Sequence, residues 1–332
     1  MVYGKTSDHV LELTSVLPDG TLLKTAPMSA KKAWQKASKE GSRESQLYAQ
    51  VLESCFDNRE QILEKFPRLN RFLTGYDLEH VFNDDLSEFD LSRVITGSEG
   101  TLAFVTEAKL NITPLAPHKA LVNIKYDSFE SALRNSPFLV EAKATSVETV
   151  DSTVLNLAKK DIVWYSVSDY IKDVPGSEID GLNIVEYNAV NEDTIKGQIA
   201  DLSARLDELI ANKQAGVLGY QVTYEKAAIG KIYAMRKKAV GLLGNAEGDK
   251  KPQAFAEDTA VPPEHLADFI MEFRALLDAH KLDYGMFGHV DAGVLHVRPA
   301  LDLCDPEQEK LLRKISDEVV ALTAKYNGLM WG

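Results

Sequence analysis

The region after Pro117 alternates short apolar strand-like runs with longer helical patterns, and this alternation limits the fold more than any other feature of the chain. The strand-like runs cover residues 120–126, 142–150, 182–188 and 216–222, followed by an extended segment over 253–261. The helical patterns cover residues 128–138, 153–160, 192–213, 225–243, 263–280 and 306–326. Because a sheet must bury its apolar face against another layer, this order predicts an α+β fold in which helices cover a sheet. The connections are short enough for ferredoxin-like units with an antiparallel sheet.

The first 116 residues are organised differently. Residues 1–26 predict a β-hairpin around Pro18-Asp19-Gly20, since these residue types favour a tight turn. From about residue 27 to 91 the pattern predicts a helical insertion with Ser29 as an N-cap and helices over 31–39, 43–56 and 59–66. Strand character returns over 92–96 and 102–113. Pro114 and Pro117 then mark a boundary, so we expect one domain over 1–116 and a second over 117–332.

Composition excludes several classes of protein. The chain has 332 residues and a formal net charge of −13, which makes nucleic acid an unexpected partner. No apolar run is long enough for a transmembrane segment, and the acidic residues near the start argue against a secretory signal, so we expect a cytoplasmic protein. The two cysteines, Cys55 and Cys304, are too few to ligate an iron–sulfur cluster within this chain.

Two histidines stand out near the C-terminal end. His289 and His296 bracket residues 290–295, which predict two short strands around an Ala292-Gly293 turn. With a two-residue loop the histidines would be direct cross-strand neighbours on one face, able to bind one divalent ion such as Zn²⁺ or two oxygens of a small substrate. The other face, with Met286, Val290, Leu295 and Val297, is apolar and is expected to pack into a core. The alternative is a pair of structural histidines that only fasten the hairpin.

A glycine-containing turn stands between the two strand-like runs of the first domain. Residues 97–102, Gly-Ser-Glu-Gly-Thr-Leu, would let bare backbone amides approach a large planar or anionic ligand. Taken alone, such a turn is more often a simple connection between strands.

The turn belongs to a longer pattern that resembles a known family. Residues 3–10, residues 16–20 and the 97–102 turn together resemble the FAD-binding domain of the vanillyl-alcohol oxidase and p-cresol methylhydroxylase superfamily. Residues 288–296, Gly-His-Val-Asp-Ala-Gly-Val-Leu-His, resemble the Gly-His-x-Gly-Asp-Gly-Asn-Leu-His signature of the FAD-linked oxidase C-terminal domain. The chain looks most like D-2-hydroxyglutarate and D-lactate dehydrogenases of the long bacterial type, which fuse flavin and iron–sulfur domains.

The resemblance implies the C-terminal part of a p-cresol methylhydroxylase-type FAD-binding domain, followed by a ferredoxin-like substrate (cap) domain. It implies FAD as cofactor, zinc or a similar divalent metal at His289 and His296, and substrate binding by Arg236. The residues implied to contact FAD are Gly97, Ser98, Gly100, Thr101 and Leu102. Arg298 lies on the same predicted face as the histidines and is a further candidate for a carboxylate, although an arginine at a strand end can simply face solvent.

The chain also departs from the family pattern. It has no Gly-Gly pair for a pyrophosphate loop, and it stops at Gly332, where the family continues into a Glu-His-Gly loop. We therefore expect a middle part of a longer flavoenzyme, which alone would purify without FAD and be inactive, with any iron–sulfur cluster in a later domain. Asp291, Ala292 and Val294 replace the family's Gly, Asp and Asn, which leaves the turn and the substrate open.

The expected function is oxidation of a small D-2-hydroxy acid by hydride transfer to FAD, with the particular acid and the electron acceptor left open. Two alternatives remain: a non-catalytic binding or structural module, and a zinc-dependent hydrolase in which His289 and His296 hold the metal. The context of the 97–102 turn argues against both.

Overall fold

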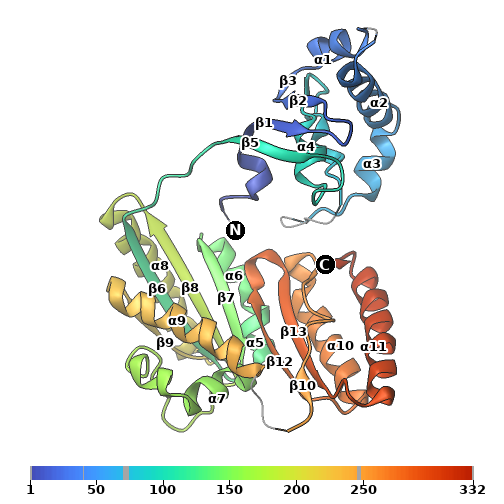
Figure 1. Ribbon diagram of the computed structural model, residues 1–332. Helices are drawn as coiled ribbons and strands as arrows, with labels where there is room; N and C mark the ends of the chain where they lie inside the picture. Colours follow the sequence, from blue (N-terminus) through green and yellow to red (C-terminus); the bar gives the residue numbers. More distant parts are fainter. Residues whose placement is uncertain (1, 40, 70–74, 245–247, 331–332) are drawn as a thin grey trace. The chain divides into compact units, whose positions relative to one another are not determined.

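The computed structural model describes residues 2–39, 41–69, 75–244 and 248–330. The chain divides into two compact units, Tyr3–Pro114 and Leu115–Gly332 together with Met1–Val2 (Figure 1). The division falls at the prolines that punctuate the sequence between residues 114 and 117.

The smaller unit contains a three-stranded antiparallel sheet in the order β2-β1-β5. The strands are β1 (Val10–Val16), β2 (Leu22–Thr25) and β5 (Phe104–Leu110). A short 3₁₀ helix, η1 (Thr6–His9), comes directly before β1. The predicted hairpin is confirmed: β1 pairs with β2, and the connecting turn closes with the Gly20 amide donating to the Leu17 carbonyl over 2.9 Å. Gly20 has φ +83°, which explains a glycine at this position.

The predicted helical insertion is also helical in the structure. Its elements are β3 (Met28–Ser29), α1 (Ala30–Ala37), α2 (Arg43–Asp57), α3 (Arg59–Lys65), η2 (Glu79–Val81) and β4 (Glu88–Phe89). Ser29 caps α1, because its side chain accepts the Lys32 amide. These elements pack around fully buried Tyr48, Leu52 and Phe89, in a core that they share with the sheet residues Leu13 and Leu23.

One predicted strand is wrong. Residues 92–96 form a short helix, α4 (Ser92–Thr96), and not a strand. The Asp90 carboxylate accepts the Ser92 amide over 2.9 Å and so starts the helical turn. Val94 and Ile95 both turn into the core. The local turn at Asp90 therefore overrides the β preference of these branched side chains.

The larger unit is built on a nine-stranded sheet in which all the pairings are antiparallel, which confirms the predicted α+β class. The main path runs β14-β11-β13-β12-β7-β8-β6-β9, and β10 pairs with β13. The strands are β6 (His118–Tyr126), β7 (Ser146–Asp151), β8 (Gly181–Ala189), β9 (Val217–Thr223), β10 (Lys251–Pro252), β11 (Thr259–Ala260), β12 (Tyr284–His289), β13 (Val294–Leu301) and β14 (Leu329–Met330).

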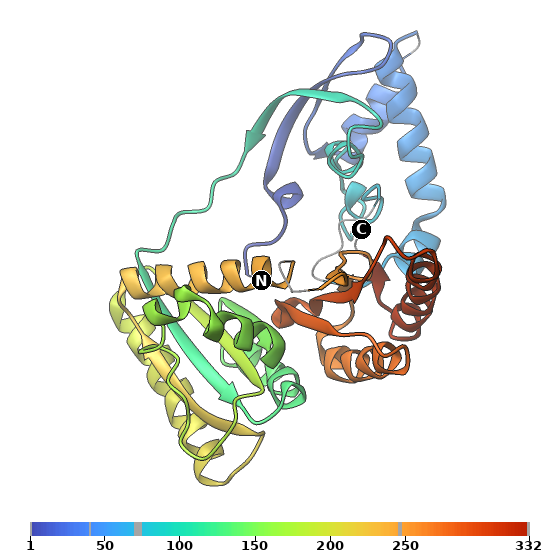
Figure 2. The ribbon, with the colours of Figure 1, turned by 60° about the horizontal axis from the view of Figure 1, so that its bottom comes forward.

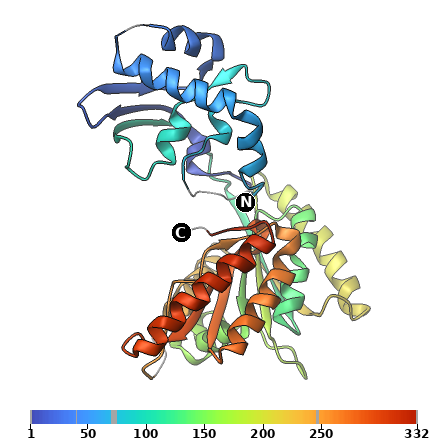
Figure 3. The same cartoon turned by 90° about the vertical axis from the view of Figure 1, so that its right-hand side faces the viewer.

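Helices cover both faces of this sheet (Figure 3). The helical elements are α5 (Phe129–Arg134), α6 (Ser136–Glu141), α7 (Ser152–Lys160), η3 (Ile162–Ser166), α8 (Glu192–Ala211), α9 (Lys226–Leu243), η4 (Pro263–His265), α10 (Leu266–Ala279), η5 (Val290–Ala292) and α11 (Pro306–Lys325). One core joins α5, α8, α10 and α11 to the sheet. The other core joins α7 and α9 to the opposite face, and α9 is seen lengthwise in Figure 2.

A buried carboxylate ties α7 to β12. Asp151 caps α7 by accepting the Val154 amide over 2.9 Å, and its second oxygen accepts the Met286 amide over 2.8 Å. Burial raises the pKa of Asp151 to about 7, although both amides favour the ionised form. The residue fixes the start of β12, the strand that ends in His289.

Candidate functional site

The histidine hairpin has a longer loop than the sequence predicted. His289 pairs with Val294 and His296 pairs with Phe287, so the proposed direct pairing of the two histidines is wrong. Residues 290–293 form the loop, in which η5 is followed by Gly293 with φ +70°. The two-residue turn required positive φ at Ala292 as well, which alanine disfavours, whereas this loop requires it only at Gly293.

The two histidines nevertheless share a face, as predicted. Their positions differ by two residues in the pairing, which keeps the side chains on one side of the sheet. Their ring centroids lie 5.6 Å apart with the ring planes at 84°. The predicted apolar face is confirmed as well: Met286, Val290, Leu295 and Val297 are buried in the core.

A carboxylate holds each histidine at Nδ1. His289 Nδ1 lies 2.9 Å from Glu148 Oε1, and His296 Nδ1 forms an ion pair with Asp258 Oδ1. Because an ionised carboxylate only accepts hydrogen bonds, His289 donates from Nδ1 to Glu148, which leaves its Nε2 as the ring atom for another partner. Paired carboxylate and histidine side chains of this kind orient the ring of a metal-binding or proton-transferring histidine.

Arg236 reaches the same group from α9. Its guanidinium forms an ion pair with Glu148 Oε2, so Glu148 contacts both Arg236 and His289. Within the described residues, Arg236 Nε is buried and has no hydrogen-bond partner. The structure therefore brings Arg236 and His289 together through one carboxylate and leaves a donor of the arginine unused.

Arg298 is occupied by another carboxylate. Its Nε and Nη2 donate to the two oxygens of Glu257 over 2.6 and 3.2 Å, and its guanidinium lies 5.5 Å from the centre of the Phe287 ring. Phe287 in turn packs against the His296 ring at 4.9 Å. Arg298 thus adjoins the histidines through Phe287. A ligand carboxylate would have to displace Glu257 from Arg298 or bind Arg298 together with Glu257.

Sequence reasoning missed Glu148, Glu186 and Tyr233. The Tyr233 hydroxyl donates to Glu186 one helical turn before Arg236 on α9. Burial and this carboxylate raise the pKa of Tyr233. Glu186 stands in a mostly apolar strand, β8, where an acidic residue is a signal that would have pointed to it, whereas Glu148 stands in β7 among other polar residues.

The described residues contain no group of three or more His, Cys, Asp or Glu side chains arranged to hold a metal ion. His289 and His296 are thus two ligand candidates without a third from this part of the chain. Cys55 and Cys304 are free thiols, the first buried and the second exposed.

The glycine turn lies in the smaller unit between α4 and β5, not between two strands. Gly97 packs against backbone: a Cβ there would fall 2.4 Å from the Gly75 carbonyl oxygen. Ser98 is buried and donates from Oγ to the Ile95 carbonyl over 2.7 Å. The Gly97 and Ser98 side of the turn is therefore structural.

The outer part of the turn is open. Glu99 and Gly100 have φ +49° and +76°, and a Cβ on Gly100 would meet nothing within 4 Å. In the described part of the chain no hydrogen bond uses the amides of these two residues. Consecutive unused amides in an exposed turn suit an anionic ligand.

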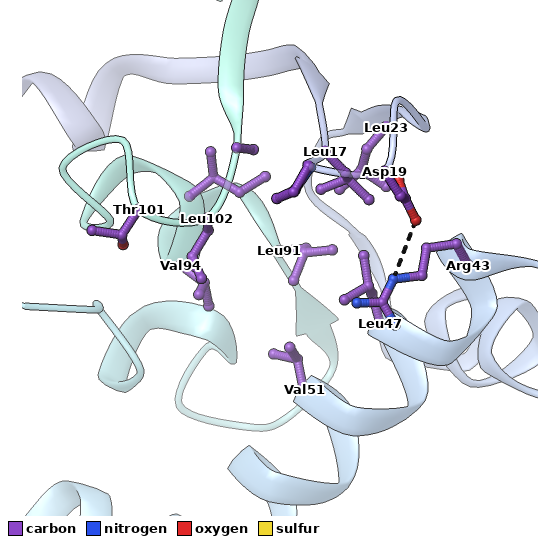
Figure 4. A pocket seen from close by; sticks show the side chains of 13 residues that line it. Leu17, Asp19, Leu23, Arg43, Leu47, Val51, Leu91, Val94, Thr101 and Leu102 are labelled. Atoms are coloured by element: carbon purple, nitrogen blue, oxygen red, sulfur yellow. Dashed lines mark ion pairs between the residues drawn. The ribbon is translucent and has the colours of Figure 1, made fainter.

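A cavity of about 340 Å³ lies beside this turn and is lined by Thr101 and Leu102 (Figure 4). Most of its wall is apolar: Leu17, Leu23, Leu47, Val51, Leu91, Val94, Ile95 and Ala103. Arg43 and Asp19 form an ion pair of 3.7 Å at its edge. The apolar part of the wall suits a non-polar group of a ligand and not a phosphate.

None of the helices in the described ranges is both long and apolar enough to cross a membrane.

The sequence is similar to known proteins along its whole length. It is 64% identical over all 332 residues to the D-2-hydroxyglutarate dehydrogenase of Escherichia coli K12 and 48% identical over 99% of the chain to that of Pseudomonas putida. The chain spans about a third, 32%, of the length of each. A D-lactate dehydrogenase of Anaerostipes hadrus is 24% identical over 74% of the chain and 50% of its own length.

Solved structures have the same fold. An alkyldihydroxyacetonephosphate synthase matches 99% of the chain and 50% of its own with a TM-score of 0.57 at 13% identity. A p-cresol methylhydroxylase with substrate bound matches 98% of the chain and 57% of its own with a TM-score of 0.54 at 11% identity. The predicted p-cresol methylhydroxylase-type architecture is thereby confirmed. The family described as "FAD linked oxidases, C-terminal domain" matches residues 115–332, and the chain belongs to this family.

Proposed function

We propose that the complete protein is a flavin-dependent dehydrogenase that oxidises D-2-hydroxyglutarate or a related D-2-hydroxy acid. The observation that carries the proposal is the convergence of Arg236 with the histidine pair on one sheet face, joined through Glu148. The names of the similar proteins support the substrate class.

Arg236 is assigned to the substrate carboxylate. A guanidinium binds a carboxylate through two parallel hydrogen bonds, and Glu148 engages Arg236 at Nη2 alone. Arg298 is assigned to a second carboxylate, which a 2-hydroxyglutarate carries and a lactate does not. This second assignment requires Glu257 to share or release Arg298.

The histidines are assigned to the substrate hydroxyl. With Nδ1 held by Glu148 or Asp258, each ring offers Nε2 to a hydroxyl or to a metal ion. His289 and His296 would supply two ligands to a zinc or similar ion, which lowers the pKa of a hydroxyl bound to it. The remaining ligand would come from outside the described residues.

FAD, which the family name implies, would supply the acceptor for a hydride from the hydroxyl-bearing carbon of the substrate. The open amides of Glu99 and Gly100 fit an anionic part of this cofactor, whereas Gly97 and Ser98 serve the packing of the turn. Thr101 and Leu102 adjoin the apolar cavity and are assigned to the non-polar surroundings of the cofactor. Any iron–sulfur centre would lie outside these 332 residues, and the electron acceptor is not assigned.

The test uses the complete gene product with an artificial electron acceptor. D-2-hydroxyglutarate should be oxidised and its L-enantiomer should not. His289→Gln should reduce kcat/KM by at least about 100-fold, since one general acid–base or ligand group contributes 10²–10⁴-fold. A substitution at His280, which pairs with Glu318 on α11, serves as the matched control and should leave the rate unchanged. Equal rates in the wild type and His289→Gln would remove the histidine site from the reaction.

Two other functions have less support. A zinc-dependent hydrolase would use the same two histidines, and ester or amide hydrolysis by the purified protein would favour it. A purely structural role for the histidines predicts that His289→Gln alters stability and no activity.

A further inference from the structure

Glu148 contacts both of the side chains that the proposed function needs most. It stands on β7 directly opposite His289 in the β7–β12 pairing. Its Oε1 accepts from His289 Nδ1 over 2.9 Å, and its Oε2 pairs with Arg236 from α9. One carboxylate therefore connects a strand residue and a helix residue that are far apart in sequence.

The surroundings of Glu148 restrict its movement. The side chain is 13% exposed, and the Arg236 side chain is 19% exposed. A carboxylate with so little solvent depends on its partners, since removing one partner of a buried pair leaves an uncompensated charge. Glu148 is thus held in place by Arg236 at one oxygen while the other oxygen orients His289.

The contact also leaves Arg236 partly unused. Glu148 takes the guanidinium at Nη2, whereas the buried Nε has no partner in the described chain. A guanidinium has five donors in a planar fork, and Nε shares one edge with Nη2, so a ligand carboxylate would bind at Nη1 while Glu148 keeps its own contact.

We propose that Glu148 is a positioning residue that aligns His289 and Arg236 as one unit. It fixes His289 with the proton on Nδ1, so that Nε2 faces the reacting hydroxyl, and it presents the free edge of Arg236 to the substrate carboxylate. This inference rests on the proposed function and deepens it, because it adds a residue that touches neither the substrate nor the cofactor.

The kinetic test is Glu148→Gln in the complete gene product. Gln keeps the shape and removes the charge, and kcat/KM for D-2-hydroxyglutarate should fall about 10- to 100-fold, as is typical for carboxylates that orient a working histidine. The matched control is Glu318→Gln, which changes another glutamate that holds a histidine, His280, but contacts neither His289 nor Arg236. The control should stay within about threefold of the wild type.

A double-mutant cycle separates positioning from a general loss of structure. Glu148→Gln combined with Arg236→Lys should lose less than the product of the two separate losses, because both changes break the same unit. Losses that multiply fully, or a Glu148→Gln variant within twofold of the wild type, would overturn the proposal. A wild type that oxidises no 2-hydroxy acid would overturn the proposed function instead.

A spectroscopic test does not depend on activity. In the 332-residue chain with ¹⁵N-labelled histidine, neutral His289 should carry its proton on Nδ1, with its signals assigned by their loss in His289→Gln. A proton on Nε2 in the wild type would refute the positioning role whatever the kinetics show.

Discussion

Gly293→Ala should be among the most destabilising single-methyl changes in the larger unit. Gly293 has φ +70°, and a Cβ there would lie 1.8 Å from the Val261 carbonyl oxygen. The backbone conformation costs an alanine about 1–2 kcal/mol. Relieving the overlap adds about 1–3 kcal/mol, as for overpacking elsewhere, and it must disturb the bond from the Val261 amide to the Gly293 carbonyl. The expected loss is about 3 kcal/mol.

Two other glycines of the same unit separate these contributions. Gly176 has φ +77° but an open surrounding, so Gly176→Ala should cost only the conformational part, about 1 kcal/mol. Gly197 is a helical glycine on α8 with nothing within 4 Å, and Gly197→Ala should stabilise by about 0.5–1 kcal/mol. Urea unfolding followed by circular dichroism measures all three. A Gly293→Ala variant within about 0.5 kcal/mol of Gly176→Ala would show that the loop yields easily and refute the reasoning.

Three further predictions concern other sites. Arg236→Lys keeps the charge but loses the planar fork, and steady-state kinetics should show a loss of about 2–4 kcal/mol in kcat/KM with unchanged flavin content; unchanged kcat/KM would remove Arg236 from the site. Asp151 has its pKa raised to about 7. Between its ordinary pKa and about 7, the carboxyl is therefore protonated in the folded state and ionised in the unfolded state. The stability of the wild type relative to Asp151→Asn should therefore decrease as pH rises through that window, and an increase in urea titrations would contradict it. Gly97→Ala should destabilise the smaller unit, since its Cβ would overlap the Gly75 carbonyl, whereas Gly100→Ala should cost about 1 kcal/mol; equal thermal shifts would contradict this difference.

Much of the larger unit could be predicted because its elements follow local periodicity. The helix over residues 192–213 and the strand over 182–188 match α8 and β8 closely, since α8 buries one regular set of apolar positions and β8 is a short run buried on both faces. The error at residues 92–96 arose where Val94 and Ile95 suggested a strand, while the Asp90 side chain fixed a helical turn.

The candidate site was predictable only in part. The shared face of His289 and His296 followed from the alternation of side chains along strands. His289 pairs with Val294 instead of His296, and a shift of two residues leaves both side chains on the same face. Glu148, in contrast, lies 141 residues before His289 in the sequence, and no local pattern connects them. Its contact with Arg236 depends on how α9 crosses the sheet, which is a tertiary property.

The most direct test of the proposed function is anaerobic reduction of the bound flavin in the complete gene product. D-2-hydroxyglutarate should bleach the flavin absorbance in the wild type, and the L-enantiomer should not. In His289→Gln the flavin should stay bound while D-2-hydroxyglutarate no longer bleaches it. A flavin that no D-2-hydroxy acid reduces, or one that is reduced equally fast in His289→Gln, would contradict the proposed function and its site.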